Sequence, residues 1–106
     1  MDGKLIAPAP LDADGYPSDF STMEEQMRAT YANAVKVLAQ FGATLDDVVQ
    51  ETLFVLDMPA AFAVAGKVRK EAYGTDRPRV ASNIIGVKSL ANPEQLIEIS
   101  YRAIKA

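Results

Sequence analysis

Several residue types that enzymes commonly use for catalysis are missing from this chain. Its 106 residues include no histidine and no cysteine. Imidazole bases, Ser-His-Asp triads, thiol nucleophiles, cysteine zinc sites and disulfides are therefore excluded. Any chemistry must rely on carboxylates, arginine, lysine, tyrosine, hydroxyls, backbone groups and water.

The side chains that could act instead are scattered along the sequence. Arg79 could bind an anion, although the neighbouring Asp76 and Arg77 are also typical of a plain charged loop. Asp12 and Asp14 could begin a metal-binding loop, but without further spaced acidic residues a turn is the stronger interpretation. The glycines are too dispersed to form a phosphate-binding loop. We therefore expect neither a metal nor another cofactor.

Charge and hydropathy narrow the classes of partner. Lys and Arg total 11 against 14 Asp and Glu, a formal net charge of -3, and no basic block is present. Since non-specific nucleic-acid binding depends on neutralising phosphates, we expect no nucleic-acid partner. No run approaches the ~20 apolar residues that a membrane span needs, and the first residues lack the apolar core of a signal peptide. We expect a soluble, cytoplasmic protein with one domain over residues 1–106 and no membrane partner.

Hydrophobic periodicity predicts two helices and four strands. A short edge strand is expected at residues 4–9, because the prolines at positions 8 and 10 cannot donate to a sheet ladder. The first helix begins at Thr22 or Ser21 and ends near Gly42. One apolar stripe marks its buried side: Met27, Tyr31, Ala34, Leu38 and Phe41.

The remaining elements follow from similar signals. A mostly buried strand is predicted at residues 46–57, a second helix from Pro59 to Tyr73, and further strands at 80–87 and 96–104. The last strand alternates, with residues 97, 99, 101 and 103 on one face and Glu98, Ser100 and Arg102 on the other. Two helices can cover only one face of a mixed four-stranded sheet, which predicts an α+β architecture. The uncovered face carries Ile104 among polar residues, and on so small a domain this favours an oligomer.

The order and spacing of several segments resemble the Rid family, the reactive intermediate deaminases, also called the YjgF or L-PSP endoribonuclease family. Residues 9–15 are similar to the family's early strand-to-turn segment, and residues 25–34 to its first helix. Residues 42–55 resemble its most recognisable stretch. Residues 85–87 and 96–99 match its final hairpin.

This resemblance implies a chorismate-mutase-like fold that assembles as a homotrimer with clefts at the subunit interfaces. Active members hydrolyse 2-imino acids, released by pyridoxal-phosphate enzymes, to 2-oxo acids and ammonia. In such a cleft an arginine fork holds the substrate carboxylate, backbone groups position the imine, and a carboxylate orients water.

Position by position, the resemblance assigns Glu98 as the carboxylate that orients water. It places Gly86 and Tyr16 among the substrate-binding residues. For Tyr16 the alternative is an aromatic side chain that packs on the sheet. Alignment backward from Gly86 puts Ser82 where the family has its substrate-binding arginine, whereas alignment forward from the second helix brings Arg79 close to that place. We favour Ser82, because a loop tolerates insertions better than a strand does.

Two further positions depart from the family pattern. Residues 6–8 are Ile, Ala and Pro where the family has Ser-Gly-Gln, and Gly66 stands where its second helix carries Asn.

The leading hypothesis is therefore a trimer that binds a small carboxylate metabolite but lacks the arginine that usually holds the substrate carboxylate. The second hypothesis is an active 2-iminobutanoate/2-iminopropanoate deaminase that uses Arg79. The third, an endoribonuclease or translation inhibitor, is the weakest because the chain has no basic stripe.

Overall fold

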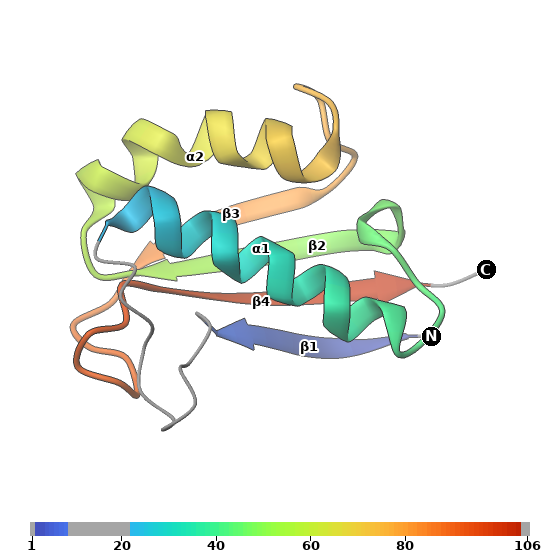
Figure 1. The fold of residues 1–106 in the computed structure, drawn as a ribbon, viewed down its shortest axis with the longest axis horizontal. Coiled ribbons are helices and arrows are strands. Elements are labelled where there is room, and N and C mark those ends of the chain that lie inside the picture. The colour runs from blue at the N-terminus through green and yellow to red at the C-terminus, as the bar shows by residue number, and fades with distance from the viewer. Residues whose placement is uncertain (1, 9–21, 105–106) are drawn as a thin grey trace.

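The computed structural model describes residues 2–8 and 22–104. In chain order the elements are β1 (Asp2–Pro8), α1 (Met23–Ala39), the 3-10 turn η1 (Leu45–Asp47), β2 (Val48–Val55), α2 (Met58–Tyr73), β3 (Ala81–Gly86) and β4 (Ile97–Ile104). The strands form one mixed sheet in the order β1-β4-β2-β3. Strand β4 is antiparallel to both of its neighbours, whereas β2 and β3 are parallel and α2 connects them. Both helices lie on one side of the sheet (Figure 1), which confirms the predicted α+β class.

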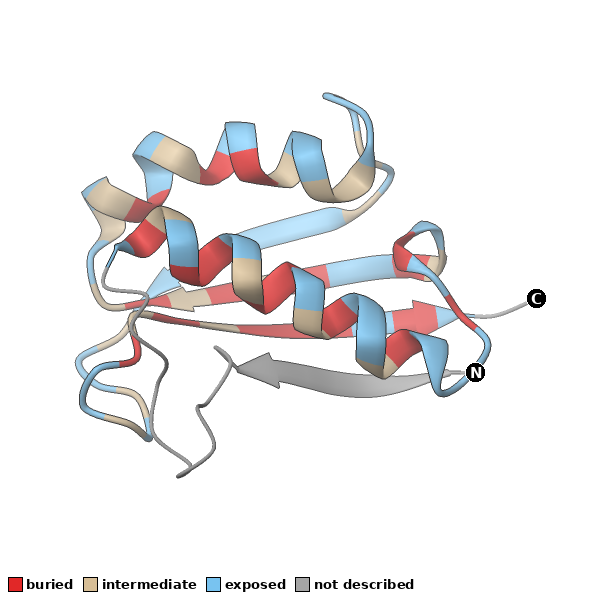
Figure 2. Cartoon of the chain, in the orientation of Figure 1, coloured by how far each residue is buried: buried red, intermediate tan, exposed pale blue. Residues whose placement is uncertain are grey.

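The core fills the space between the helices and the two central strands. The predicted alternation of β4 is confirmed, since Ile97, Ile99, Tyr101 and Ala103 are each no more than 3% exposed. Across the sheet, Leu53 on β2 pairs with Ile99 and is fully buried. The core therefore lies on the helix side of β2 and β4, whose buried residues are red in Figure 2.

Helix α1 begins and packs as predicted but ends earlier. The Thr22 hydroxyl accepts a hydrogen bond from the backbone N–H of Glu25 at 3.1 Å, so Thr22 is the N-cap. The predicted stripe is buried except for Phe41, which is 52% exposed. Phe41 was expected to continue the stripe, but it follows the last helical residue, and Gly42 then reverses the chain with φ 69°.

Strand β2 is shorter than the predicted span of 46–57. Its expected first residues lie in the 3-10 turn η1, where the Thr44 hydroxyl accepts from the Asp46 N–H and the Asp47 carboxylate accepts from the Thr44 N–H. A bulge between Val48 and Gln50 then leaves Val49 42% exposed, so the expectation of a largely buried strand is wrong at that position.

Strands β3 and β4 also depart in part from expectation. β3 covers residues 81–86 and forms an edge of the sheet, and nearly all of it is exposed (Figure 2). On β4, the alternation leaves Ser100 on the face opposite the helices, as predicted, but it is only 5% exposed. Its flanking positions are occupied by β1 and β2, whose Ile6 and Thr52 pair with it.

Candidate functional site

A cavity of about 590 Å³ lies between α2 and the edge strand β3. Its lining is mostly apolar and comprises Leu53, Met58, Phe62, Ala65, Gly66, Arg69, Ser82 and Ile84. The polar side chains among these are Arg69 and Ser82. Gly66 contributes to the opening because it has no side chain, and a Cβ at this position would meet nothing within 4 Å. The cavity is therefore an apolar recess with one polar end.

The polar end is built on a buried carboxylate. Glu51, on β2, is 1% exposed and pairs with Ser82 in the parallel ladder. Its Oε1 accepts from the Arg69 Nε at 2.8 Å and from the Ser82 hydroxyl at 2.9 Å. The Arg69 Nη2 donates in turn to the Ser82 Oγ at 2.7 Å. Helix α2 and strands β2 and β3 thus meet through three polar side chains.

Two tyrosines complete the coordination of this carboxylate. The Oε2 of Glu51 accepts from the Tyr31 hydroxyl at 3.0 Å and from the Tyr73 hydroxyl at 2.7 Å. Glu51 therefore accepts four hydrogen bonds, which matches the roughly four lone-pair sites of a carboxylate. We call Glu51, Arg69, Ser82, Tyr31 and Tyr73 the Glu51 cluster. Its central charge is paired and fully hydrogen-bonded, as a buried ion requires.

The two tyrosines and Arg69 of the Glu51 cluster each have a raised pKa. Burial raises the pKa of the Tyr73 phenol, and the nearby Glu51 carboxylate raises it further. The same two causes raise the pKa of Tyr31. Burial alone would lower the pKa of the Arg69 guanidinium, but Glu51 outweighs it and the net pKa lies above the usual value. Both phenols therefore remain donors and Arg69 remains a cation.

The raised tyrosine pKa values predict resistance to alkaline titration. Of the four tyrosines in the chain, Tyr31, Tyr73 and Tyr101 have a raised pKa. Since the folded pKa exceeds the unfolded value of about 10, their stabilising contribution is complete below that pH and is lost as the pH rises above it. We expect phenolate absorbance for these three to appear only with alkaline unfolding, followed by circular dichroism. Titration of all four near pH 10 in the folded protein, at about the unperturbed value, would contradict the burial described here.

The predicted substrate-binding residues lie in different places. Ser82 lines the cavity and belongs to the Glu51 cluster. Gly86 ends β3 just behind the cavity, where a Cβ on this residue would lie 3.8 Å from the side chain of Met58, one of the lining residues. Tyr16 lies outside the described residues, as do Asp12 and Asp14.

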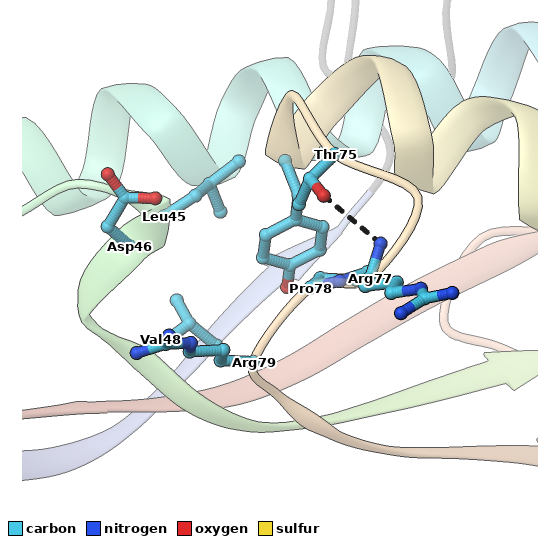
Figure 3. A pocket seen from close by; sticks show the side chains of 8 residues that line it. Leu45, Asp46, Val48, Thr75, Arg77, Pro78 and Arg79 are labelled. Carbon is cyan, nitrogen blue, oxygen red and sulfur yellow. Dashed lines mark hydrogen bonds between the residues drawn. The ribbon is translucent and has the colours of Figure 1, made fainter.

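Arg79 lies at a second surface cavity, of about 670 Å³, which Tyr73, Thr75 and Arg77 also line. Figure 3 shows the guanidinium groups of Arg77 and Arg79 directed away from each other, while the backbone N–H of Arg77 donates to the Thr75 hydroxyl at 3.2 Å. The two arginines therefore do not converge on one anion. Arg79 does not line the cavity that holds Ser82.

Glu98 lies on the other face of the sheet from the Glu51 cluster. Its neighbours Ile97 and Ile99 are buried under the helices, so the alternation of a strand directs Glu98 the opposite way. Along the sheet, Glu98 pairs with Phe54, whereas Ala81, two residues after Arg79, pairs with Gln50. Four residues of strand correspond to about 13 Å. One chain therefore does not bring Glu98 together with either Arg79 or Ser82.

Sequence reasoning missed the residues that make this site, Glu51 and Arg69. A usable signal was present for Glu51, because it shares strand parity with the buried Leu53 and Val55. A charged residue at an inward position needs a buried partner. Arg69 follows the buried Ala65 by one helical turn and is the partner that α2 supplies.

Other kinds of site find no support in the described part of the chain. Among residues 22–104 no group of three acidic side chains is placed to hold a metal ion. Neither helix described there is long and apolar enough to cross a membrane.

Two helices on one face of a mixed sheet, with an apolar recess between a helix and the edge strand, define an α+β protein. Residues 9–105 match the model of the endoribonuclease L-PSP family. The chain therefore belongs to this family, which is also called the Rid or YjgF family. No curated protein matches the chain significantly.

Solved structures of family members are similar over nearly the whole chain. The conserved Rid-family protein YyfB of Yersinia pestis is 31% identical, with a TM-score of 0.78 over 99% of this chain and 81% of that one. Rv2704 of Mycobacterium tuberculosis, a member of the YjgF family, is 26% identical, with a TM-score of 0.75 over 99% and 81% of the two chains. YyfA of Yersinia pestis is 25% identical, with a TM-score of 0.76 over 97% and 81%.

Proposed function

We propose that this protein is a homotrimeric member of the Rid family that binds a small carboxylate metabolite in the cavity between α2 and β3 and hydrolyses ordinary 2-imino acids weakly. The observation that carries the proposal is the Glu51 cluster at the polar end of an apolar recess. It offers a cation and a hydroxyl for binding, but every oxygen of its carboxylate is already engaged.

The size and lining of the cavity support a binding function. Its volume of about 590 Å³ falls within the range of small-molecule sites. Such sites combine apolar walls with a few polar groups that fix the ligand's orientation. Here the walls come from residues such as Phe62 and Ile84, and the orienting groups are Arg69 and Ser82.

Weak hydrolysis follows from what the cavity lacks. Attack of water on an imine carbon is assisted by a base with a free lone pair, and general-base assistance contributes about 100- to 10,000-fold. Glu51 is the carboxylate at the polar end of the cavity, but its two oxygens already accept four hydrogen bonds, which leaves no free lone pair to act as a base. Ser82, at the family's arginine position, adds no charge. The Rid-like chemistry is therefore incomplete within one chain.

The surface around the cavity supports assembly with further copies. Phe62, at the cavity, is 74% exposed, and Ile85, on the outer face of β3, is 45% exposed. Large exposed apolar side chains of this kind are candidate contacts for a partner copy. Glu98 faces away from the cavity of its own chain, so it can approach such a cavity only in a neighbouring copy. A homotrimer with its clefts at the interfaces accounts for both features.

The assembly is tested by analytical ultracentrifugation. We expect a trimer at micromolar concentration, and Phe62→Lys, which places a charge at the proposed interface, should shift the distribution toward smaller species. Lys70→Gln, a change on an exposed part of the same helix, serves as the control. A stable wild-type monomer at this concentration would reject the trimer.

The activity is tested by generating a 2-imino acid with an amino-acid oxidase and following semicarbazone formation. We expect turnover about 100-fold or more below that of an active family member assayed alongside, because Ser82 cannot supply the charge of the family's arginine and Glu51 has no free lone pair to act as a base. Hydrolysis at the rate of the active member, abolished in Arg79→Ala, would instead support the deaminase that uses Arg79.

A further inference from the structure

We infer, building on the proposed function, that Arg69 of α2 is the residue that recognises the ligand's carboxylate, and that Glu51 is its positioning residue. The ligand is a monocarboxylate with an apolar side chain. This assigns the cation of the cleft to the helix, although the resemblance to the family places it on the strand that carries Ser82.

The geometry of the guanidinium supports this assignment. The planar group has five N–H donors arranged along two edges suited to bidentate contacts. The edge formed by Nε and Nη2 faces Glu51 and Ser82. Nη1 and the second N–H of Nη2 take no part in the hydrogen bonds to Glu51 and Ser82. Because Arg69 lines the cavity and its side chain is 22% exposed, the edge formed by Nη1 and Nη2 can donate hydrogen bonds to the carboxylate of a ligand.

Glu51 and its neighbours hold the guanidinium in place before a ligand arrives. Glu51 is 1% exposed and is fixed by the two tyrosine hydroxyls, so it cannot follow a moving arginine. The Arg69 Cζ also lies 5.9 Å from the centre of the Tyr73 ring, within the range of a cation–π contact. A recognition group held by supporting hydrogen bonds loses little freedom on binding.

Charge and lining together define the class of ligand. Glu51 offsets the charge of Arg69, so a carboxylate on the free edge is recognised mainly by directional hydrogen bonds. The other lining side chains are apolar apart from Ser82, for example Phe62, Met58 and Ile84. A second carboxylate on the ligand would be desolvated there without a partner, which is costly. The cavity therefore selects monocarboxylates over dicarboxylates.

Isothermal titration calorimetry with three probes tests the inference on the intact protein. The probes are 4-methyl-2-oxopentanoate, its neutral amide, and 2-oxoglutarate. We expect the monocarboxylate to bind at least about 10-fold more tightly than either of the others. The amide has only one acceptor oxygen and would turn its NH2 group toward the guanidinium donors. The second carboxylate of 2-oxoglutarate would be desolvated without a partner. Equal binding of the acid and its amide, or no binding of the acid, overturns the inference.

Variants separate the role of Arg69 from the integrity of the cavity. Arg69→Lys keeps the charge beside Glu51 but removes the planar edge, so the preference for acid over amide should fall about 10-fold. Lys70→Gln, which removes an exposed cation from the same helix, should leave the preference unchanged. If Arg69→Lys fails to fold, as judged by circular dichroism, the comparison of probes on the wild type still decides the inference. An unchanged preference in folded Arg69→Lys overturns it.

Gly66→Leu distinguishes this inference from the proposed function. A leucine at this helical position enters the open space of the cavity and should abolish binding of both acid and amide. If Gly66→Leu removes binding but the wild type does not prefer the acid, the cavity is the site and Arg69 is not its recognition group. If Gly66→Leu binds both probes as the wild type does, the cavity is not the site and the proposed function fails with the inference.

Discussion

Replacing Arg69 with methionine is expected to lower the free energy of unfolding by about 3–5 kcal/mol, because it leaves a buried carboxylate without its cation. Glu51 is 1% exposed and receives its charge-assisted hydrogen bond from the Arg69 Nε at 2.8 Å. The three remaining hydroxyl donors satisfy its hydrogen bonds but do not balance its charge. Equilibrium unfolding in urea measures the loss.

A second substitution shows whether the loss comes from the charge. Adding Glu51→Gln to Arg69→Met removes the unpaired charge, while the amide oxygen still accepts from Tyr31 and Tyr73. The double variant should therefore be more stable than Arg69→Met alone, since removing both partners of a buried pair costs less than removing one. A loss below about 1 kcal/mol for Arg69→Met would contradict this description, because a buried carboxylate that depends on Arg69 would lose more.

Truncation of Leu53 to alanine is expected to cost about 2–5 kcal/mol, the range for large-to-small changes in a packed core. Leu53 is fully buried in β2 and its backbone pairs with Ile99 on one side and Ile84 on the other. The substitution removes apolar contacts and leaves a cavity that the two flanking strands cannot collapse to fill. Chemical denaturation of the two proteins under one set of conditions gives the difference.

Val49→Ala is the matched control on the same strand. Val49 is 42% exposed at the bulge, so its truncation should change stability by no more than about 0.5 kcal/mol. Equal losses for Leu53→Ala and Val49→Ala would mean that the two side chains do not differ in burial, and the register of β2 described here would be wrong.

Local sequence patterns were sufficient for most of the fold. The alternation of β4 follows the two-residue period of a strand, and the stripe of α1 from Met27 to Leu38 follows the 3.6-residue period of a helix. Both patterns can be recognised from residues close together in the sequence. The predicted elements differ from the structure where a local feature of the backbone interrupts the periodic pattern. The contact between Thr44 and Asp47 converts the expected start of β2 into a 3-10 turn, and the bulge after Val48 turns Val49 outward.

The candidate site was less predictable because it joins residues that are distant in sequence. Arg69 follows Glu51 by 18 residues, and Ser82 follows it by 31. Only the packing of α2 over β2 and β3 brings the three side chains together. The family alignment drew attention to Ser82, because Ser82 stands at a position the family uses. It could not indicate Arg69, which comes from another element and donates to Ser82.

The position of β4 in the sheet has a consequence for synthesis of the chain on the ribosome. β4 is the last strand to be made, yet it lies between β1 and β2 and supplies the partner for both. Until β4 has been made, β1 has no neighbouring strand in the described sheet. In the same period β2 can pair only with β3, along its other edge. Because these pairings are long-range, the nascent chain cannot acquire its central core before β4 has been synthesised. The apolar strand β2 must therefore be kept from aggregating until translation has passed β4.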